Sequence, residues 1–227
     1  MSLPRGTQLK ITRAVLAASA SGGKVRRYIP WQFGLDYDAI GRASAQDLFD
    51  EQLDVRGLLR SQQGEGVKWT VVSTGMFMSF LFEEDFGVVS LRGGEGKERV
   101  TALGSWENEL TVTEVGDIGR VVAELVLDDE EVESGVVYVA GDTVSMSRLA
   151  DVVEGALGRK VERRVKSVQE LEAELREQPG DVMRKYRAVF AAGVGVSWEK
   201  ERSFNARRGI ETVLVEDWAR NLKVPVA

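Results

Sequence analysis

The side chains best suited to chemistry lie in one short segment that reads Pro-Trp-Gln-Phe-Gly-Leu-Asp-Tyr-Asp. Its two carboxylates, Asp36 and Asp38, could exchange protons with a substrate, as paired carboxylates do in acid–base catalysis. A solvated loop is the simpler interpretation of the same pair. The aromatic side chains of Trp31, Phe33 and Tyr37 could wall a ligand pocket, although packing within the loop explains them equally well.

The chain contains no histidine and no cysteine. Ser-His-Asp and Cys-His catalysis, a Cys/His zinc centre and disulfides are therefore excluded, and we expect no metal site. The sequence has no P-loop, no Gly-x-Ser-x-Gly elbow and no glycine-rich dinucleotide fingerprint. None of the 4 tyrosines has a lysine four positions later, so a Tyr-x-x-x-Lys pair is absent. Acid–base chemistry is left to carboxylates, lysine, tyrosine, a cofactor or water.

The composition is that of an ordinary globular protein of 227 residues. With 30 Lys and Arg against 36 Asp and Glu, the net charge is −6, which argues against a nucleic-acid partner. No apolar run has the length of a membrane helix, and the first residues lack the apolar core of a signal peptide. We therefore expect a cytoplasmic protein.

The elements that position these residues follow a helix–strand–helix–strand order. Apolar spacing predicts a helix over 8–21 and a short strand over 25–30. A second helix over 44–62 should begin with the capping pattern Ser44-x-x-Asp47, and a β-branched strand should follow over 67–74. This order is typical of a parallel sheet with crossover helices, in which ligands bind at the carboxyl ends of the strands.

Later segments continue the alternation. We expect further strands and helices as follows: strands at 100–103, 110–113, 135–140 and 161–165, and helices at 117–127, 145–157, 167–178 and 181–192. Residues 210–222 should end the fold, with Glu216 near the start of the last helix. The acidic run 128–133 is interpreted as a solvated connection.

Several motifs resemble those of the NmrA-like and isoflavone-reductase-like family of atypical short-chain dehydrogenases. Residues 30–34, Pro-Trp-Gln-Phe-Gly, are similar to that family's Pro-Ser-Glu-Phe-Gly. Residues 49–56 resemble its Phe-x-x-Lys-x-x-(Ile/Val)-Arg, with Gln52 at the lysine position. Residues 69–77 resemble Tyr-Thr-x-Val-x-x-x-x-Phe, and 117–119 resemble its Asp-Ile-Gly helix start. The resemblance covers about residues 8–222 and looks closest to the fungal branch, many of whose members belong to secondary metabolism.

The resemblance implies an α/β fold with a Rossmann-like parallel sheet and a smaller C-terminal α/β part that binds substrate. Residues 1–75, joined again by 110–140, would be the remainder of the NAD(P)-binding domain. Residues 76–109 and 141–227 would form the substrate-binding part. We expect the first strands of the family fold, with their Gly-x-x-Gly-x-x-Gly turn, to be missing, which would expose a sheet edge and favour self-association.

The resemblance also implies NADPH as cofactor and hydride transfer to a small aromatic or enone-type metabolite. Because the glycine-rich turn that holds the cofactor phosphates is expected to be missing, we expect NADPH binding to be weak. The family's cofactor loops map onto Pro30, Trp31, Gln32, Phe33, Gln52, Thr74, Gly75, Met76 and Phe77. Substrate would contact Met78, Phe80 and Leu81. Gln52 takes the place of the catalytic lysine, and a carboxamide can donate a hydrogen bond but cannot act as a general acid. A non-catalytic dinucleotide sensor and an inactive shortened product are the alternative interpretations.

Overall fold

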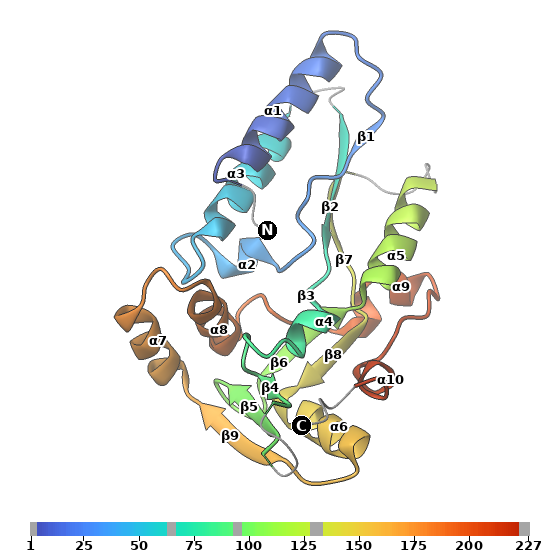
Figure 1. The fold of residues 1–227 in the computed structure, drawn as a ribbon. Helices are drawn as coiled ribbons and strands as arrows, with labels where there is room; N and C mark the ends of the chain where they lie inside the picture. The colour runs from blue at the N-terminus through green and yellow to red at the C-terminus, as the bar shows by residue number, and fades with distance from the viewer. Residues whose placement is uncertain (1–3, 63–66, 93–96, 128–133, 223–227) are drawn as a thin grey trace.

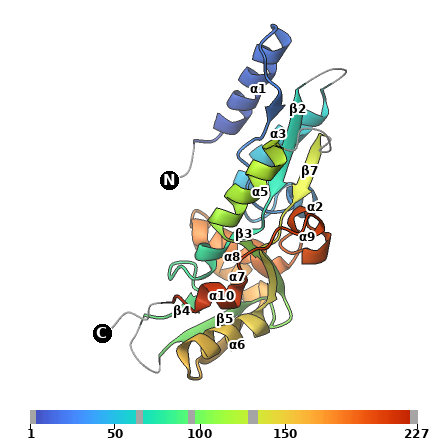
Figure 2. The same ribbon diagram turned by 90° about the vertical axis from the view of Figure 1, so that its right-hand side faces the viewer.

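The computed structural model describes residues 4–62, 67–92, 97–127 and 134–222. Within these residues the strands form three small sheets, and helices pack around each of them (Figure 1; Figure 2). The α/β class predicted from the sequence is confirmed. Among the described residues, no helix combines the length and the apolar character that a bilayer crossing requires.

The first sheet contains β1 (Arg27–Tyr28), β2 (Lys68–Ser73) and β7 (Gly135–Tyr138), in the order β1-β2-β7. Both strand pairs are parallel. A single bridge between Gly34 and Ser73 continues the pairing beyond β1. The chain therefore leaves β1 and β2 at the same edge of this sheet.

Helices cover both faces of the first sheet. Helices α1 (Thr7–Ala20) and α3 (Leu48–Arg60) lie on one side of β2, and α5 (Val115–Leu127) lies on the other (Figure 1). β2 is consequently buried along almost its whole length, as a central parallel strand with two covered faces should be.

Alternation along β2 divides its side chains between the two helical layers. Val71 packs in a cluster with Val55 of α3, whereas Val72 packs with Leu125 of α5. All four of these side chains are fully buried, so β2 is fixed from both sides and its carboxyl end is held in one place.

The second sheet contains β3 (Met76–Phe77), β6 (Glu109–Thr113) and β8 (Asp142–Ser145). β3 pairs with β6 in parallel, whereas β6 and β8 are antiparallel. The third sheet contains β4 (Val89–Ser90) and β5 (Arg99–Leu103), which are antiparallel. Its other edge is β9, in parallel with β5.

Strand β9 spans Glu162–Lys166. The remaining helices are α2 (Tyr37–Ile40), α4 (Met78–Leu81), α6 (Met146–Leu157), α7 (Val168–Glu177), α8 (Val182–Ala192), the 3-10 helix η1 (Lys200–Arg202), α9 (Phe204–Arg207) and α10 (Val215–Ala219). Among these, α9 belongs with the first sheet, because Phe204 packs with Val72 of β2 and Leu125 of α5.

Two sequence expectations need correction. The later strands do not all join one parallel arrangement, because the β4–β5 and β6–β8 pairs are antiparallel. The helix expected from Ser44 begins at Leu48, because the Ser44 hydroxyl donates to the Gln46 carbonyl instead of capping a first turn. The acidic run 128–133 lies outside the described residues, and the division into two domains stays a prediction.

Candidate functional site

A cavity of about 200 Å³ lies at the carboxyl ends of β1 and β2. Its walls come from the loop after β1, the β2–β3 connection, and helices α2, α3, α4 and α8. The lining residues are Phe33, Gly34, Leu35, Tyr37, Phe49, Gly75, Met76, Phe77, Phe80, Tyr186 and Phe190. We call this space the aromatic cavity, because seven of these eleven residues are Phe or Tyr.

Edge, tilted and stacked ring contacts hold the walls of the aromatic cavity together. The ring centroid of Tyr186 lies 6.2 Å from that of Phe49 and 5.7 Å from that of Phe80. The rings of Tyr37 and Phe49 are 4.8 Å apart, and those of Tyr186 and Phe190 are 6.4 Å apart. These separations fall in the range that aromatic pairs prefer, so residues distant in sequence form one continuous apolar wall.

Two phenols face this apolar surface. Burial, with a smaller contribution from the nearby Tyr186, raises the pKa of Tyr37 to about 12. Burial also raises the pKa of Tyr186 above its ordinary value. Both hydroxyls are therefore protonated at neutral pH and can act as hydrogen-bond donors, which suits a ligand carbonyl.

The backbone at the strand ends is tied together below the cavity. The amides of Thr74 and Gly75 both donate to the Gly34 carbonyl, at 2.9 and 3.0 Å. Gly75 has a φ of 71°, and a Cβ there would lie 2.1 Å from the Thr111 carbonyl oxygen. Glycine is required at this position, because a side chain would push the second sheet away.

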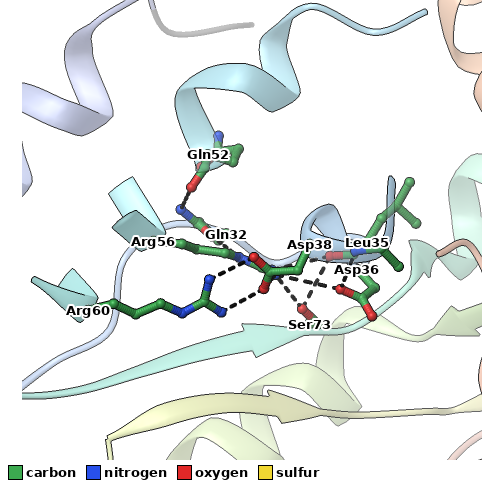
Figure 3. Close-up of polar contacts among 9 residues, drawn as sticks. Gln32, Leu35, Asp36, Asp38, Gln52, Arg56, Arg60 and Ser73 are labelled. Atoms are coloured by element: carbon green, nitrogen blue, oxygen red, sulfur yellow. Dashed lines mark hydrogen bonds and ion pairs between the residues drawn. The ribbon is translucent and has the colours of Figure 1, made fainter. Parts of the chain in front are cut away.

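On the other side of the same loop, the guanidinium of Arg56 is fully buried at the centre of a polar network (Figure 3). Its Nε donates to Gln32 Oε1 at 3.0 Å, and its Nη1 donates to Asp38 Oδ2 at 2.8 Å. Its Nη2 donates to the Leu35 carbonyl at 3.3 Å and to Ser73 Oγ at 3.1 Å. This network, the Arg56 centre, joins α3, the loop after β1 and the end of β2.

The Asp38 carboxylate links the Arg56 centre to the surface. Arg60 donates to it through two nitrogens, each at 2.7 Å. The hydrogen bonds from Arg60, supported by those from Arg56, lower the pKa of Asp38 to about 2. Asp36 accepts from the Ala39 amide at 3.2 Å and caps α2. The two carboxylates of residues 30–38 therefore have structural roles in this loop: Asp38 forms ion pairs and Asp36 caps a helix.

Gln52 lies on α3, three residues after Phe49 of the cavity wall. Its backbone carbonyl accepts a hydrogen bond from Gln32 Nε2 at 3.0 Å, which connects it to the Arg56 centre (Figure 3). Its side-chain Oε1 is buried and has no hydrogen-bond partner among the described residues. Gln52 thus carries an unpaired acceptor in the protein interior, although it is not part of the cavity lining.

The structure brings only some of the predicted site residues to the aromatic cavity. Phe33, Gly75, Met76, Phe77 and Phe80 line it. The other predicted residues lie elsewhere: Pro30, Gln32, Thr74, Met78 and Leu81 are buried, Gln52 is half-buried, and Trp31 is 52% exposed. Their assigned roles stay predictions.

Sequence reasoning missed three parts of the site. Tyr186 and Phe190 come from α8, and their spacing of four residues on one helix face was the available signal. Phe49 appeared in the motif comparison but not as a wall residue. The apolar periodicity of the sequence gave no indication that the Arg56 side chain is buried. Among the described residues there is no cluster of carboxylates that could hold a metal ion.

The fold and this site describe an α/β protein with an apolar cavity at the carboxyl ends of parallel strands, where ligands bind in sheets of this kind. Residues 3–197 match the model of the NmrA-like family, and the chain belongs to this family. The resemblance seen in the sequence motifs is thereby confirmed.

Individual relatives agree with this assignment. The chain is 43% identical over 226 residues to an NmrA-like family domain-containing oxidoreductase of Gibberella moniliformis, covering 99% of this chain and 70% of the relative. It is 26% identical over 205 residues to a phenylcoumaran benzylic ether reductase of Pyrus communis, covering 87% of this chain but 64% of the relative. The chain thus spans less than two thirds of the pear reductase.

Solved structures share the fold. Isoflavone reductase superimposes with a TM-score of 0.75 at 17% identity, over 97% of this chain and 72% of that protein. An NADPH-dependent quinone oxidoreductase of Escherichia coli, solved with NADPH, superimposes with a TM-score of 0.68 at 18% identity. The match covers 96% of this chain and 72% of that protein. At such identities the likeness concerns the fold alone.

Proposed function

We propose that this chain is an NADPH-dependent reductase of a small aromatic or enone-type metabolite, which it binds in the aromatic cavity. The observation that supports this most directly is the cavity itself, at the carboxyl ends of β1 and β2 in a chain of this family. Relatives named above are reductases, and one structural neighbour was solved with NADPH. The resemblance to the fungal branch favours a role in secondary metabolism.

The residues present fit the nicotinamide end of such a cofactor. The cavity offers an apolar ring-sized space, and the buried Oε1 of Gln52 is an acceptor without a partner among the described residues. We assign Gln52 to a hydrogen bond with a ribose hydroxyl, a carboxamide N–H or the substrate. When bound, NADPH supplies a hydride, which is the chemistry that a chain without histidine or cysteine does not carry itself.

The chain's own residues would exclude water, orient the substrate and hold its oxygen. Phe49, Phe80 and Phe190 would pack against the rings of substrate and cofactor. The phenols of Tyr37 and Tyr186 would donate hydrogen bonds to a substrate oxygen that gains negative charge, because both are protonated at neutral pH. Their raised pKa also makes them slow to give up a proton completely, so a proton from water would finish the reduction.

One observation favours a second function, a dinucleotide-binding regulator without turnover. The position of the family's lysine is occupied by Gln52, and a carboxamide cannot deliver a proton. In that case the same cavity would bind the dinucleotide, and no hydride would leave it.

Two assays on the purified protein separate these functions. NADPH binding is measured by titration calorimetry, and NADPH oxidation is followed with a panel of aromatic enones and aldehydes. For a reductase we expect oxidation that falls about 10- to 100-fold in kcat/KM for Tyr186→Phe, because one donor to the developing oxyanion is lost.

Tyr28→Phe is the matched control, because Tyr28 contacts Thr12 through its hydroxyl at 3.0 Å and lies outside the cavity. It should leave kcat/KM unchanged. Gln52→Lys should raise the rate if proton delivery limits it. Binding of NADPH without oxidation, by wild type and Gln52→Lys alike, would favour the regulator, and absence of NADPH binding would contradict both functions.

A further inference from the structure

A second cavity, of about 140 Å³, lies on the third sheet and is built from basic side chains. Its lining residues are Gly87, Arg99, Thr101, Leu103, Arg164, Lys166 and Arg187. It shares no lining residue with the aromatic cavity. We call it the basic cavity, because four of the seven residues carry a positive charge in a chain whose net charge is −6.

Strand register explains how these charges meet. β5 and β9 are parallel, with Thr101 opposite Arg164 and Leu103 opposite Lys166. Side chains two residues apart on a strand point to the same face, so Arg99, Thr101 and Leu103 share one face with Arg164 and Lys166. Helix α8 packs against β5 and adds Arg187 to the lining of this cavity.

The positive charge in the basic cavity is only partly neutralised. Arg99 lies 4.0 Å from Glu162, and Lys166 is hydrogen-bonded to Glu174. Arg164 and Arg187 form no ion pair with any carboxylate among the described residues. Two guanidinium groups therefore face this small space without a counter-charge in contact.

The side chain of Arg187 provides a second observation that points to a bound hydrogen-bond acceptor. Its Nη1 donates to the Phe86 carbonyl at 3.4 Å, which holds the side chain in place. Its Nε is buried and has no hydrogen-bond partner within the described part of the chain. A buried N–H of a charged group without an acceptor is costly, so an acceptor brought by a ligand would be favoured here.

We propose that the basic cavity binds a small oxyanion, the phosphate or carboxylate group of a metabolite or the free ion. Guanidinium groups recognise both through paired N–H···O bonds, and the Thr101 hydroxyl can add one more. The volume suits one such group and is too small for a nucleotide or a drug-sized ligand. The site is distinct from the proposed reductase site and does not depend on it.

The test is calorimetric titration of the full chain with inorganic phosphate, sulfate and acetate at constant ionic strength, with sodium chloride as reference. We expect one saturable site for at least one oxyanion, with a Kd of about 1 mM or tighter. Tighter binding of phosphate than of acetate would assign the site to phosphate groups, and the reverse order would assign it to carboxylates.

Two variants locate the binding. Arg164→Gln should weaken it at least tenfold, and because Arg164 is exposed this change leaves the folded core intact. Arg187→Gln should weaken binding similarly. Arg202→Gln is the matched control, an exposed arginine on η1 outside the cavity, and should bind as wild type does. No saturable binding at tens of millimolar oxyanion, the same heat with chloride, or unchanged affinity in Arg164→Gln would overturn the proposal.

Discussion

The loop that follows β1 has two sides with opposite character. On one side its side chains line the aromatic cavity through Phe33 and Tyr37. On the other side Gln32, Asp38 and the Leu35 carbonyl hold the fully buried guanidinium of Arg56. The first side is apolar and open to a ligand, whereas the second is charged and occupied by protein groups.

The difference shows how the two sides divide positioning and binding. In the Arg56 centre each nitrogen of the guanidinium has an acceptor, so its geometry is over-determined. The aromatic cavity has few directional contacts and leaves space for a ligand. Tyr37 connects the two, because its ring forms part of the cavity wall while Arg56 lies 4.9 Å from the ring centroid. The polar side fixes the backbone of the loop, so the walls of the apolar side are held in a defined place.

Replacing the buried arginine should damage the molecule most. Arg56→Met keeps much of the side-chain volume but leaves Gln32 Oε1 without its buried donor and removes one of the two arginines that bind Asp38. The Ser73 hydroxyl and the Leu35 carbonyl would keep only the hydrogen bond between them. We expect the free energy of unfolding to fall by about 3 kcal/mol, measured by urea denaturation. If the Arg56→Met protein that remains folded also fails to bind ligands of the aromatic cavity, the polar side positions that cavity.

Arg60→Met is the matched control. It removes the other arginine that contacts Asp38. The Arg60 side chain is 48% exposed. Exposed ion pairs contribute little to stability, so we expect the free energy of unfolding to fall by less than about 1 kcal/mol. If the two variants lose equal stability, the buried centre is no more important to the fold than the surface pair, and the contrast drawn above is wrong.

A smaller effect should follow from crowding the open side. A Cβ added at Gly34 would lie 2.2 Å from the Tyr37 hydroxyl oxygen. Gly34→Ala should therefore displace the Tyr37 ring, lower the free energy of unfolding by about 1–2 kcal/mol and reduce the affinity for ligands of the cavity. Urea denaturation and ligand titration together measure the two consequences.

Gly57→Ala provides the comparison for that variant. Gly57 is exposed within α3, and a Cβ there would meet nothing within 4 Å. Alanine favours a helix, so this change should raise stability by about 0.5–1 kcal/mol. Unaltered ligand affinity and stability in Gly34→Ala would show that Tyr37 moves freely, and the cavity wall would then be less defined than its ring contacts indicate.

The sequence predicted those parts of the fold that local spacing controls. The helices at 8–21 and 181–192 and the buried strand at 67–74 were recognisable from apolar periodicity alone. The two-residue strands β3 and β4 were not, because pairing with distant strands creates them and their own sequence carries no period. The antiparallel pairs escaped for the same reason, since strand direction depends on tertiary packing.

The candidate site was predictable to a similar extent. Phe33 and Phe77 followed from the rule that ligands bind where parallel strands end, and the structure places both at the cavity. Tyr186 and Phe190 did not follow, because spacing says which residues share a helix face but not which loop that face covers. Arg187, next to Tyr186, contributes instead to the basic cavity, so one helix serves two unrelated spaces.

The least disruptive test of the comparison uses pH. Asp38 joins the buried Arg56 to the exposed Arg60, and the hydrogen bonds from these arginines lower its pKa from 3.8 to about 2. A carboxyl whose pKa is lower in the folded state stabilises the fold above its unfolded pKa and loses that contribution as pH falls. The stabilisation should therefore be complete near neutral pH and should decline between about pH 4 and pH 2.

Asp38→Asn removes this titration while keeping the size of the side chain. Near neutral pH we expect wild type to exceed the variant by less than about 1 kcal/mol, because the carboxylate is one-third exposed and solvent screens it. The difference between the two proteins should shrink as pH falls below about 4, measured by urea denaturation across the acid range. Taking the difference cancels the other carboxylates that titrate there. A difference that stays constant with pH would mean that Asp38 contributes through its shape alone, and the charged side of the loop would then owe its order to Arg56 and its neutral partners.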